Sequence, residues 1–386
     1  MSIISDTDKY IAHSYKRLPV AITSGKGSLL YDDGGSEYID FGSGIAVNVF
    51  GASDTEWISA VTGQLGKISH TSNYYYSGPQ SSLAAMLCSR THFTNMFFCN
   101  SGAEANESAI KAARKYSADK YGSGRSKIVT LKNSFHGRTI TTLSATGQDR
   151  FHNHFFPFTQ GFEFAKPNDF ADTAEKLGDD SAALMIELIQ GEGGVNTLTS
   201  EYVKAVSDLC KKKDILLIVD EVQTGLGRTG RLFCYENYGI YPDIITTAKG
   251  LGGGLPIGAA MFAEKVAGTL TPGTHGSTFG GNPVCAAGAL SVIKRLDNAL
   301  FEQVNKKSKY IIERLSALKN VSGITGMGLM IGIKTVKDPA MVMDSCLKKG
   351  LLVLNANDKV RLLPALNIPF DILEKGIDIL SEVIEE

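Results

Sequence analysis

The stretch Asp243-Ile244-Ile245-Thr246-Thr247-Ala248-Lys249 decides the fold of this chain. Its apolar and β-branched residues do not alternate with polar ones, which is typical of a strand buried on both faces of a parallel sheet. The stretch ends on Lys249, and five of the nine residues that follow this lysine are glycine. Glycine lets the backbone pass close to a bulky group. We therefore expect Lys249 to lie at the end of a buried strand, beside space for a ligand.

Two interpretations of Lys249 are open at this point. A lysine that loses solvation is disfavoured as an ammonium ion, so its amine can act as a nucleophile. The obvious use of such an amine is a Schiff base with a carbonyl cofactor, above all pyridoxal 5'-phosphate (PLP). The alternative is a lysine that caps the strand end and extends its ammonium group to water.

The rest of the chain alternates short β-branched runs with helical patterns, which predicts an α/β fold with a mostly parallel sheet covered on both faces. The predicted strands are residues 95–99, 127–131, 182–188, 215–220, 244–247 and 259–262. The predicted helices between them are residues 104–120, 201–213 and 283–295. We expect this large domain to span residues 56–290.

The two chain ends have a different texture. Residues 27–41 resemble a hairpin with a turn at Asp32-Asp33-Gly34-Gly35, and residues 300–386 mix helices with strands at 330–334 and 360–363. We expect residues 1–55 and 291–386 to pack together as one small α+β domain beside the large one.

Composition excludes several classes of protein. With 386 residues, 43% hydrophobic residues and a formal net charge of −1, the chain is typical of an ordinary globular protein without a nucleic-acid or membrane surface. The six cysteines show no Cys-x-x-Cys spacing and the seven histidines do not pair with them, so we expect no metal site. The N-terminus lacks an apolar segment, and we expect a cytoplasmic protein.

Four groups of residues have the chemistry that PLP requires. Ser101, Gly102 and Ala103 stand between a strand and a helix, where free N–H groups and the helix dipole can hold phosphate. Ser101 and Glu104 also have the spacing of a helix capping box. Asp220 ends an apolar strand and needs a cationic partner, which a pyridinium nitrogen would supply. The third group comprises Phe135, a candidate to stack on the ring, its neighbour His136, and Arg138, a candidate to bind a carboxylate. The fourth is Ser277 and Thr278, hydroxyl residues in a glycine-rich turn. Each group alone also has an ordinary structural explanation.

A competing motif lies at Gly225-Leu226-Gly227-Arg228-Thr229-Gly230, which fits the glycine pattern of NAD-dependent oxidoreductases. The glycines come several residues after the strand end at Asp220, and no amphipathic helix follows to receive a pyrophosphate. An NAD-dependent oxidoreductase is therefore a distant alternative.

Taken together, the motifs resemble the class III aminotransferases of PLP fold type I over nearly the whole chain. The resemblance rests on Ser101-Gly102-Ala103-Glu104-Ala105-Asn106-Glu107, Phe135-His136-Gly137-Arg138-Thr139, Gln190-Gly191-Glu192-Gly193-Gly194, Asp220-Glu221-Val222-Gln223-Thr224-Gly225 and Lys249-Gly250. It implies a seven-stranded, mostly parallel sheet, PLP as cofactor, and a homodimer with shared active sites.

The resemblance also implies a role for each matched residue. Lys249 would carry the cofactor and move the substrate proton, and Asp220 would hold the pyridinium nitrogen. Phe135 would stack on the ring, Gln223 would reach the ring hydroxyl, and Gly102 with Ala103 would bind the phosphate. Thr278 would complete the phosphate site of a second subunit. Arg138 would bind the distal carboxylate of the substrate, and Arg361 the near carboxylate of glutamate. Glu192 would pair with Arg361 when that carboxylate is absent, either as a movable partner or as a fixed ion pair.

Within the family, Ser43-Gly44-Ile45-Ala46-Val47-Asn48 and the segment from Tyr74 to Gln80 are similar to the branch that acts on N-acetylornithine. This implies transfer of the terminal amine of N-acetylornithine to 2-oxoglutarate, as in arginine biosynthesis. Succinylornithine, ornithine, 4-aminobutyrate and succinyl-diaminopimelate are alternative donors. Two segments depart from the family pattern, Glu187-Leu188 in place of Glu-Pro and Gly51-Ala52-Ser53-Asp54 in place of a Gly-His segment.

Overall fold

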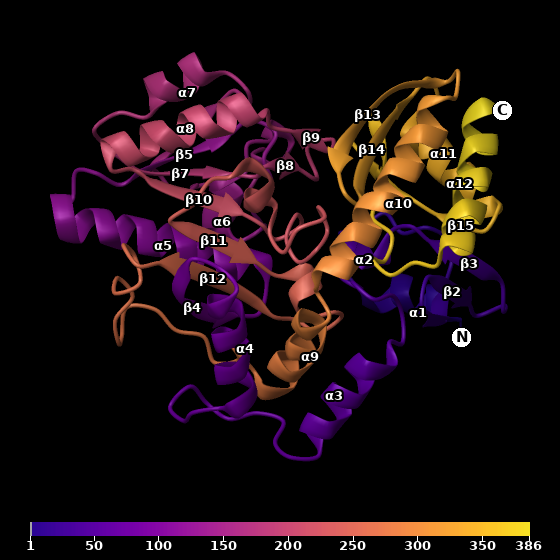
Figure 1. Cartoon of the computed structure of the whole chain (residues 1–386), viewed down its shortest axis with the longest axis horizontal. Helices are drawn as coiled ribbons and strands as arrows, with labels where there is room; N and C mark the ends of the chain where they lie inside the picture. Colours follow the sequence, from indigo (N-terminus) through magenta and orange to yellow (C-terminus); the bar gives the residue numbers. More distant parts are fainter. Residues whose placement is uncertain (1) are drawn as a thin grey trace.

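The stretch that ends on Lys249 forms β11 (Ile244–Thr247), an inner strand of a seven-stranded sheet in the computed structural model, which describes residues 2–386 (Figure 1). The sheet order is β4-β12-β11-β10-β7-β5-β6, and β12 alone runs antiparallel to its neighbours. The strands are β4 (Phe93–Cys99), β5 (Lys127–Leu131), β6 (Phe162–Ala165), β7 (Ser181–Ile186), β10 (Leu216–Asp220) and β12 (Gly258–Ala263).

Both faces of this sheet are buried, which explains the unbroken apolar runs. In β10, Leu216 and Ile218 belong to one hydrophobic cluster, whereas Leu217 and Val219 belong to a second cluster. The predicted fold class is therefore confirmed. The edge strand β6, however, is absent from the strands predicted from the sequence.

Helices cover the two faces of the large sheet. α5 (Gly102–Tyr121) contributes Ala109, Ile110 and Ala113 to the smaller hydrophobic cluster, and α8 (Ser200–Lys213) contributes Val203 and Val206 to the larger one. The other helices of this body are α3 (Thr55–Leu65), α4 (Gly78–Ser89), α6 (Ile140–Ala145), α7 (Phe170–Lys176) and α9 (Pro283–Lys294).

The two chain ends meet in the smaller body, at the right of Figure 1. A sheet of order β1-β2-β3-β15 joins β1 (Ile22–Lys26), β2 (Leu29–Asp32) and β3 (Glu37–Asp40) to β15 (Leu351–Leu352) from the C-terminal segment. A second sheet has the order β13-β14-β17-β16, with β13 (Val321–Met327), β14 (Met330–Thr335), β16 (Leu354–Ala356) and β17 (Lys359–Leu362). The helices here are α1 (Ile3–Tyr10), α10 (Asn298–Ser316), α11 (Pro339–Lys348) and α12 (Phe370–Glu385). The limits 1–55, 56–290 and 291–386 stay a prediction.

A left-handed turn, α2 (Ser43–Ala46), connects the smaller body to the region around Lys249. Its four φ angles are 46°, 62°, 64° and 62°, although Gly44 is its only glycine. The buried carboxylate of Asp40 accepts bonds from the N–H groups of Gly42 (2.8 Å) and Ser43 (2.9 Å), which holds the entry to the turn. A Cβ at Gly250 would lie 3.5 Å from the carbonyl oxygen of Ala46, so the turn packs directly against the glycine after Lys249.

We expect the substitution Ile45→Gly to raise the free energy of unfolding by about 0.5–1 kcal/mol. A left-handed conformation costs a non-glycine residue roughly 1–2 kcal/mol, and the greater flexibility of glycine in the unfolded chain offsets part of the gain. Urea titration of the purified protein measures the change. The matched control is Ile58→Gly, at an exposed isoleucine inside α3, which should lower stability. A destabilised Ile45→Gly protein would contradict the expectation.

Candidate active site

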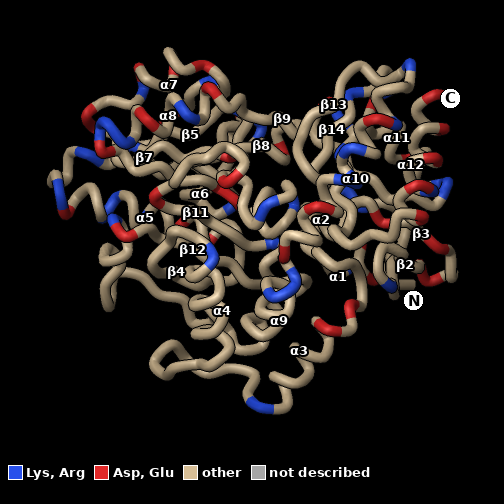
Figure 2. Tube along the Cα trace, viewed as in Figure 1, with Lys and Arg blue, Asp and Glu red and all other residues tan. Residues whose placement is uncertain are grey.

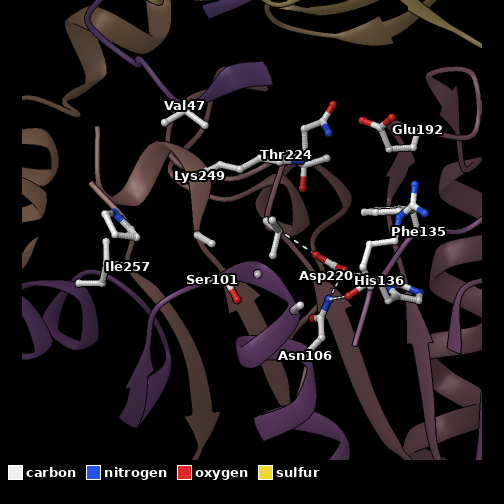
Figure 3. A pocket seen from close by; sticks show the side chains of 18 of the residues that line it. Val47, Ser101, Asn106, Phe135, His136, Glu192, Asp220, Thr224, Lys249 and Ile257 are labelled. Carbon is white, nitrogen blue, oxygen red and sulfur yellow. Dashed lines mark hydrogen bonds and ion pairs between the residues drawn. The ribbon is translucent and has the colours of Figure 1, made fainter. Parts of the chain in front are cut away.

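A cavity of about 510 Å³ opens at the ends of β10 and β11, beside the loop that follows β5. The first turn of α5 also borders this cavity (Figure 3). The sequence-predicted residues that line it are Ser101, Gly102, Ala103, Phe135, His136, Arg138, Glu192, Asp220, Gln223 and Lys249. The structure therefore brings together side chains that lie far apart along the chain. Arg361 is not part of the lining but donates hydrogen bonds to two lining side chains, those of Glu192 and Gln223. Ser277 and Thr278 are also outside the cavity lining.

Lys249 is the first residue of the 3₁₀ helix η3 (Lys249–Leu251) and has a positive φ of 42°. Its side chain extends into the cavity from the end of β11 (Figure 3). Burial lowers the pKa of its ammonium group, and the nearby carboxylates of Glu192 and Asp220 oppose this shift without cancelling it. Lys249 is therefore more readily an uncharged amine than an exposed lysine is, which is the state in which a lysine is nucleophilic.

Asp220 ends β10 with its carboxylate only 5% exposed. Its Oδ2 accepts hydrogen bonds from His136 Nδ1 (2.8 Å) and Asn106 Nδ2 (2.8 Å), and its Oδ1 accepts one from Val222 N–H (3.1 Å). These three donors fix the orientation of the carboxylate at the cavity wall. The buried His136 Nε2 has no partner among residues 2–386.

Glu187 lies behind the loop that carries Phe135. Its Oε2 accepts a hydrogen bond from Phe135 N–H at 2.8 Å. Burial and the neighbouring charge of Asp220 raise its pKa well above the usual range. The neutral form of this carboxyl group is therefore more favoured than in an exposed glutamate, and its hydrogen bond holds the backbone of the loop at Phe135.

The N-terminus of α5 faces the same cavity. Ser101 Oγ accepts a bond from Glu104 N–H (3.2 Å), which confirms half of the expected capping box. The other half differs, because Glu104 Oε2 accepts from the N–H of Asn100 (2.6 Å), one residue before the cap. The N–H groups of Gly102 and Ala103 have no acceptor within the helix, as in the first turn of any α-helix. They supply donors and a positive dipole end for an anion.

Arg361 and Glu192 form an ion pair at the wall of the cavity, with Arg361 Nη1 2.7 Å from Glu192 Oε1. The same Nη1 lies 3.0 Å from the carbonyl oxygen of Gly191 and 3.2 Å from Gln223 Oε1. Burial disfavours the charged form of Glu192, but the Arg361 guanidinium outweighs this effect and holds the Glu192 pKa below its usual range. The arginine side chain is 3% exposed and the glutamate 30% exposed, so the glutamate is the partner with room to move.

Ser277 and Thr278 lie in the loop between β12 and α9. Ser277 Oγ accepts bonds from Asn100 Nδ2 (3.2 Å) and Gly280 N–H (3.0 Å), so it stabilises this loop. Thr278 is exposed. Within one chain, neither residue contributes to the cavity.

The glycine motif from Gly225 to Gly230 is a packing feature. A Cβ at Gly227 would lie 2.7 Å from Leu366 Cδ1, and one at Gly230 would lie 2.1 Å from Asn305 Oδ1. Arg228, between them, is buried and donates to the carbonyl oxygens of Leu329 (3.1 Å) and Pro364 (2.6 Å). The glycines therefore allow the loop after β10 to pack closely against the C-terminal segment.

Three further findings concern residues 2–386 as a whole. Basic and acidic residues are interspersed over both bodies in Figure 2, in keeping with the net charge of −1. Across residues 2–386, no helix combines the length and apolar character needed to cross a bilayer. The same described part of the chain holds no group of three or more His, Cys, Asp or Glu side chains placed to bind a metal ion.

Asn106 and Glu187 are site residues that were not predicted from the sequence. Asn106 lies four residues after Gly102 in α5, and residues at this spacing share one helix face, which was the available signal. Glu187 follows directly after the fully buried β7, as Asp220 ends β10, so a carboxylate at a strand end was again the signal.

The residues of this cavity fit the predicted cofactor, PLP. Asp220 has a buried carboxylate with three neutral or histidine donors and no lysine or arginine partner among the described residues. A pyridinium nitrogen would complete this set. The free N–H groups of Gly102 and Ala103 suit a phosphate, and the buried amine of Lys249 suits an aldehyde. One cavity thus holds a group for each reactive part of PLP.

Comparison with known proteins identifies the family. Residues 10–384 match the family described as aminotransferase class-III. An acetylornithine aminotransferase from Haemophilus ducreyi is 50% identical over 380 residues, which cover 98% of this chain and 97% of that protein. The solved ornithine aminotransferase of Toxoplasma gondii ME49 has a TM-score of 0.94 at 32% identity, covering 99% of this chain and 94% of that one. The N-acetylornithine aminotransferase of Stenotrophomonas maltophilia K279a has a TM-score of 0.85 at 35% identity, with 99% and 98% covered. The chain belongs to the class III aminotransferases, a family of enzymes that use PLP as their cofactor.

Proposed function

We propose that the protein transfers the terminal amine of N-acetylornithine to 2-oxoglutarate, giving N-acetylglutamate 5-semialdehyde and glutamate, a step of arginine biosynthesis. One observation carries the proposal. A single cavity around Lys249 holds one arginine, Arg138, that has no acidic partner among residues 2–386. The cavity lies beside a second arginine, Arg361, which is neutralised by a glutamate. The name of the Haemophilus ducreyi relative supports the same reaction.

The two substrates explain why one arginine should be free and the other masked. The carboxylate of N-acetylornithine lies far from the reacting amine, whereas glutamate has one carboxylate far from its amine and one beside it. Arg138 binds the distal carboxylate in both cases. Arg361 binds the near carboxylate of glutamate once Glu192 moves away, and pairs with Glu192 when N-acetylornithine occupies the cavity. An unpaired buried guanidinium would be costly, so this exchange keeps Arg361 neutralised throughout.

The remaining residues hold the cofactor and move one proton. When bound, PLP supplies an electron sink that makes the hydrogen on the amine-bearing carbon acidic. Lys249 Nζ would hold the cofactor through its aldehyde carbon. Once the substrate amine has displaced it, the freed amine of Lys249 would move that proton from the substrate carbon to the former aldehyde carbon. Asp220 would bind the ring nitrogen in its protonated form, and a charge-assisted bond of this kind contributes about 1.5–3 kcal/mol. Phe135 and His136 would contact the ring, and Gln223 would hold the ring hydroxyl.

Ser101, Gly102 and Ala103 bind the phosphate, and we assign Ser277 and Thr278 to the phosphate site of a partner subunit. The position of these two residues outside their own cavity supports a homodimer with shared active sites. The six cysteines are all free, which supports a cytoplasmic location.

Half-reaction rates test the proposed substrate. The PLP-loaded enzyme is mixed separately with N-acetylornithine, ornithine and 4-aminobutyrate, and the loss of the cofactor's visible absorbance is followed. We expect the highest kcat/KM for N-acetylornithine. The second candidate is ornithine transamination, which the match to the Toxoplasma gondii enzyme favours. A higher kcat/KM for ornithine than for N-acetylornithine would select that candidate.

A further inference from the structure

The guanidinium group of Arg138 is held by contacts with two aromatic rings. Its Cζ lies 4.0 Å from the centroid of the Phe151 ring and 5.6 Å from that of Phe135. The two rings are 6.1 Å apart and inclined by 70°, so they form two sides of a corner. Throughout residues 2–386, Arg138 has no hydrogen bond or ion pair with another side chain or with the backbone. Without its two aromatic neighbours, an exposed arginine that makes no hydrogen bond would sample many rotamers.

The position of Phe151 is itself fixed. Phe151 ends the 3₁₀ turn η1 (Asp149–Phe151), and its N–H donates to the carbonyl oxygen of Gln148 (3.0 Å). The buried Gln148 donates through Nε2 to the carbonyl oxygen of Ser134 (3.0 Å), and Ser134 Oγ accepts from Gly147 N–H (3.0 Å). The turn that carries Phe151 is therefore tied to the loop that carries Phe135 and Arg138.

A ring stacked on a guanidinium has a definite consequence for binding. The five N–H donors of arginine lie in the plane of the guanidinium group, so a ring against its face leaves the edge donors free. An edge with parallel N–H groups matches the two oxygens of a carboxylate. The stacking contact thus orients the group without using any donor that a substrate needs.

We infer that Phe151 is a positioning residue that sets the plane of Arg138 and thereby the preference for substrates with a distal carboxylate. The inference rests on the proposed function, because Arg138 is the distal-carboxylate site only in that proposal. Phe151 lies outside the cavity lining and acts through Arg138 rather than on the substrate. Arg150 stacks on the same ring with Cζ 4.7 Å from its centroid, but its Nη2 is bound to Gln148 Oε1 (2.8 Å).

The test compares two donors that differ only in the carboxylate, N-acetylornithine and N-acetyl-1,4-diaminobutane. Their kcat/KM ratio on PLP-loaded enzyme measures carboxylate discrimination. We expect Phe151→Leu to lower this ratio roughly 10-fold by raising the KM for N-acetylornithine, with the carboxylate-free donor unchanged within about twofold. Phe151→Tyr keeps an aromatic face and should retain the wild-type ratio. Phe170→Leu, at an aromatic residue of α7 away from the cavity, is the matched control and should also retain it.

A second measurement does not depend on turnover. Glutarate has two carboxylates but neither an amine nor a keto group, and its dissociation constant can be measured by calorimetry. We expect Phe151→Leu to weaken glutarate binding roughly 5- to 10-fold. In an Arg138→Ala background, the same substitution should have no further effect on glutarate binding or on discrimination, because the residue acts through Arg138.

Two outcomes would overturn the inference. An equal loss for both donors in Phe151→Leu would show that the residue only supports the fold, and an unchanged ratio would show that it has no role in discrimination. These results differ from failure of the proposed function, in which the wild-type enzyme itself would not favour N-acetylornithine over the carboxylate-free donor.

Discussion

Replacing Lys249 with alanine should abolish turnover, with a fall in kcat of roughly 10³-fold or more. The substitution removes the buried amine that we propose as both the covalent anchor of PLP and the acid–base group that moves the substrate proton. General acid–base catalysis alone contributes about 10²–10⁴-fold. The loss should appear equally in the half-reactions with N-acetylornithine and with glutamate, because both require the same proton transfer.

The Lys249→Ala protein should still bind PLP, since Asp220 and the N–H groups of Gly102 and Ala103 are unchanged. Borohydride treatment followed by peptide mass analysis distinguishes the two modes of binding. In the wild-type protein the reagent should fix the cofactor to the peptide that contains Lys249, and in the variant it should fix none. Lys307→Ala is a suitable control, because Lys307 is also a buried lysine with a lowered pKa, about 8, but its Nζ bonds to the carbonyl oxygen of Leu366. Retained activity in Lys249→Ala would refute the assignment of this residue.

The sequence was most informative where one segment sufficed to define an environment. The strand that precedes Lys249, residues 244–247, was predicted with its observed bounds, because an unbroken apolar run followed by glycines has few alternative structures. Asp220 was identified for a related reason, since a carboxylate at the end of an apolar strand requires a partner.

Contacts between distant segments were not predictable in the same way. The bonds of Asp220 to His136 and Asn106 join residues 84 and 114 positions away along the chain, and they depend on how the strands are ordered in the sheet. The left-handed turn at Ser43–Ala46 was also missed, because Ile45 and Ala46 disfavour that conformation and only the surrounding structure imposes it. Strand β6 was missed because its short run, Phe162 to Ala165, does not stand out from the aromatic stretch before it.

The glycine motif from Gly225 to Gly230 shows that a sequence pattern can also suggest a binding site where the structure uses the residues for packing. Its spacing fits a dinucleotide site, but the glycines accommodate Leu366 and Asn305 in close packing. The position of the motif relative to the strand end was the sequence feature that distinguished these two uses.

The substitution Arg361→Ala should separate the two halves of the reaction. We expect kcat/KM for glutamate and 2-oxoglutarate to fall roughly 10²–10³-fold, because the near carboxylate loses a buried, charge-assisted partner. The half-reaction with N-acetylornithine should fall less than about 10-fold, since that substrate has no carboxylate near the reacting amine. Stopped-flow measurement of each half-reaction checks this difference, and thermal unfolding of the variant shows whether the unpaired Glu192 also weakens the fold.

Glu192→Gln is the complementary variant. It keeps the shape of the side chain but removes the charge that neutralises Arg361, so the arginine is more available to a substrate carboxylate. We expect N-acetylornithine to bind more weakly while the KM for glutamate falls or stays unchanged. If Glu192 and Arg361 instead form a fixed structural pair, Arg361→Ala should impair both half-reactions equally and Glu192→Gln should impair both as well. A glutamate half-reaction that Arg361→Ala impairs and Glu192→Gln does not impair is therefore the result that distinguishes a movable glutamate from a permanent ion pair.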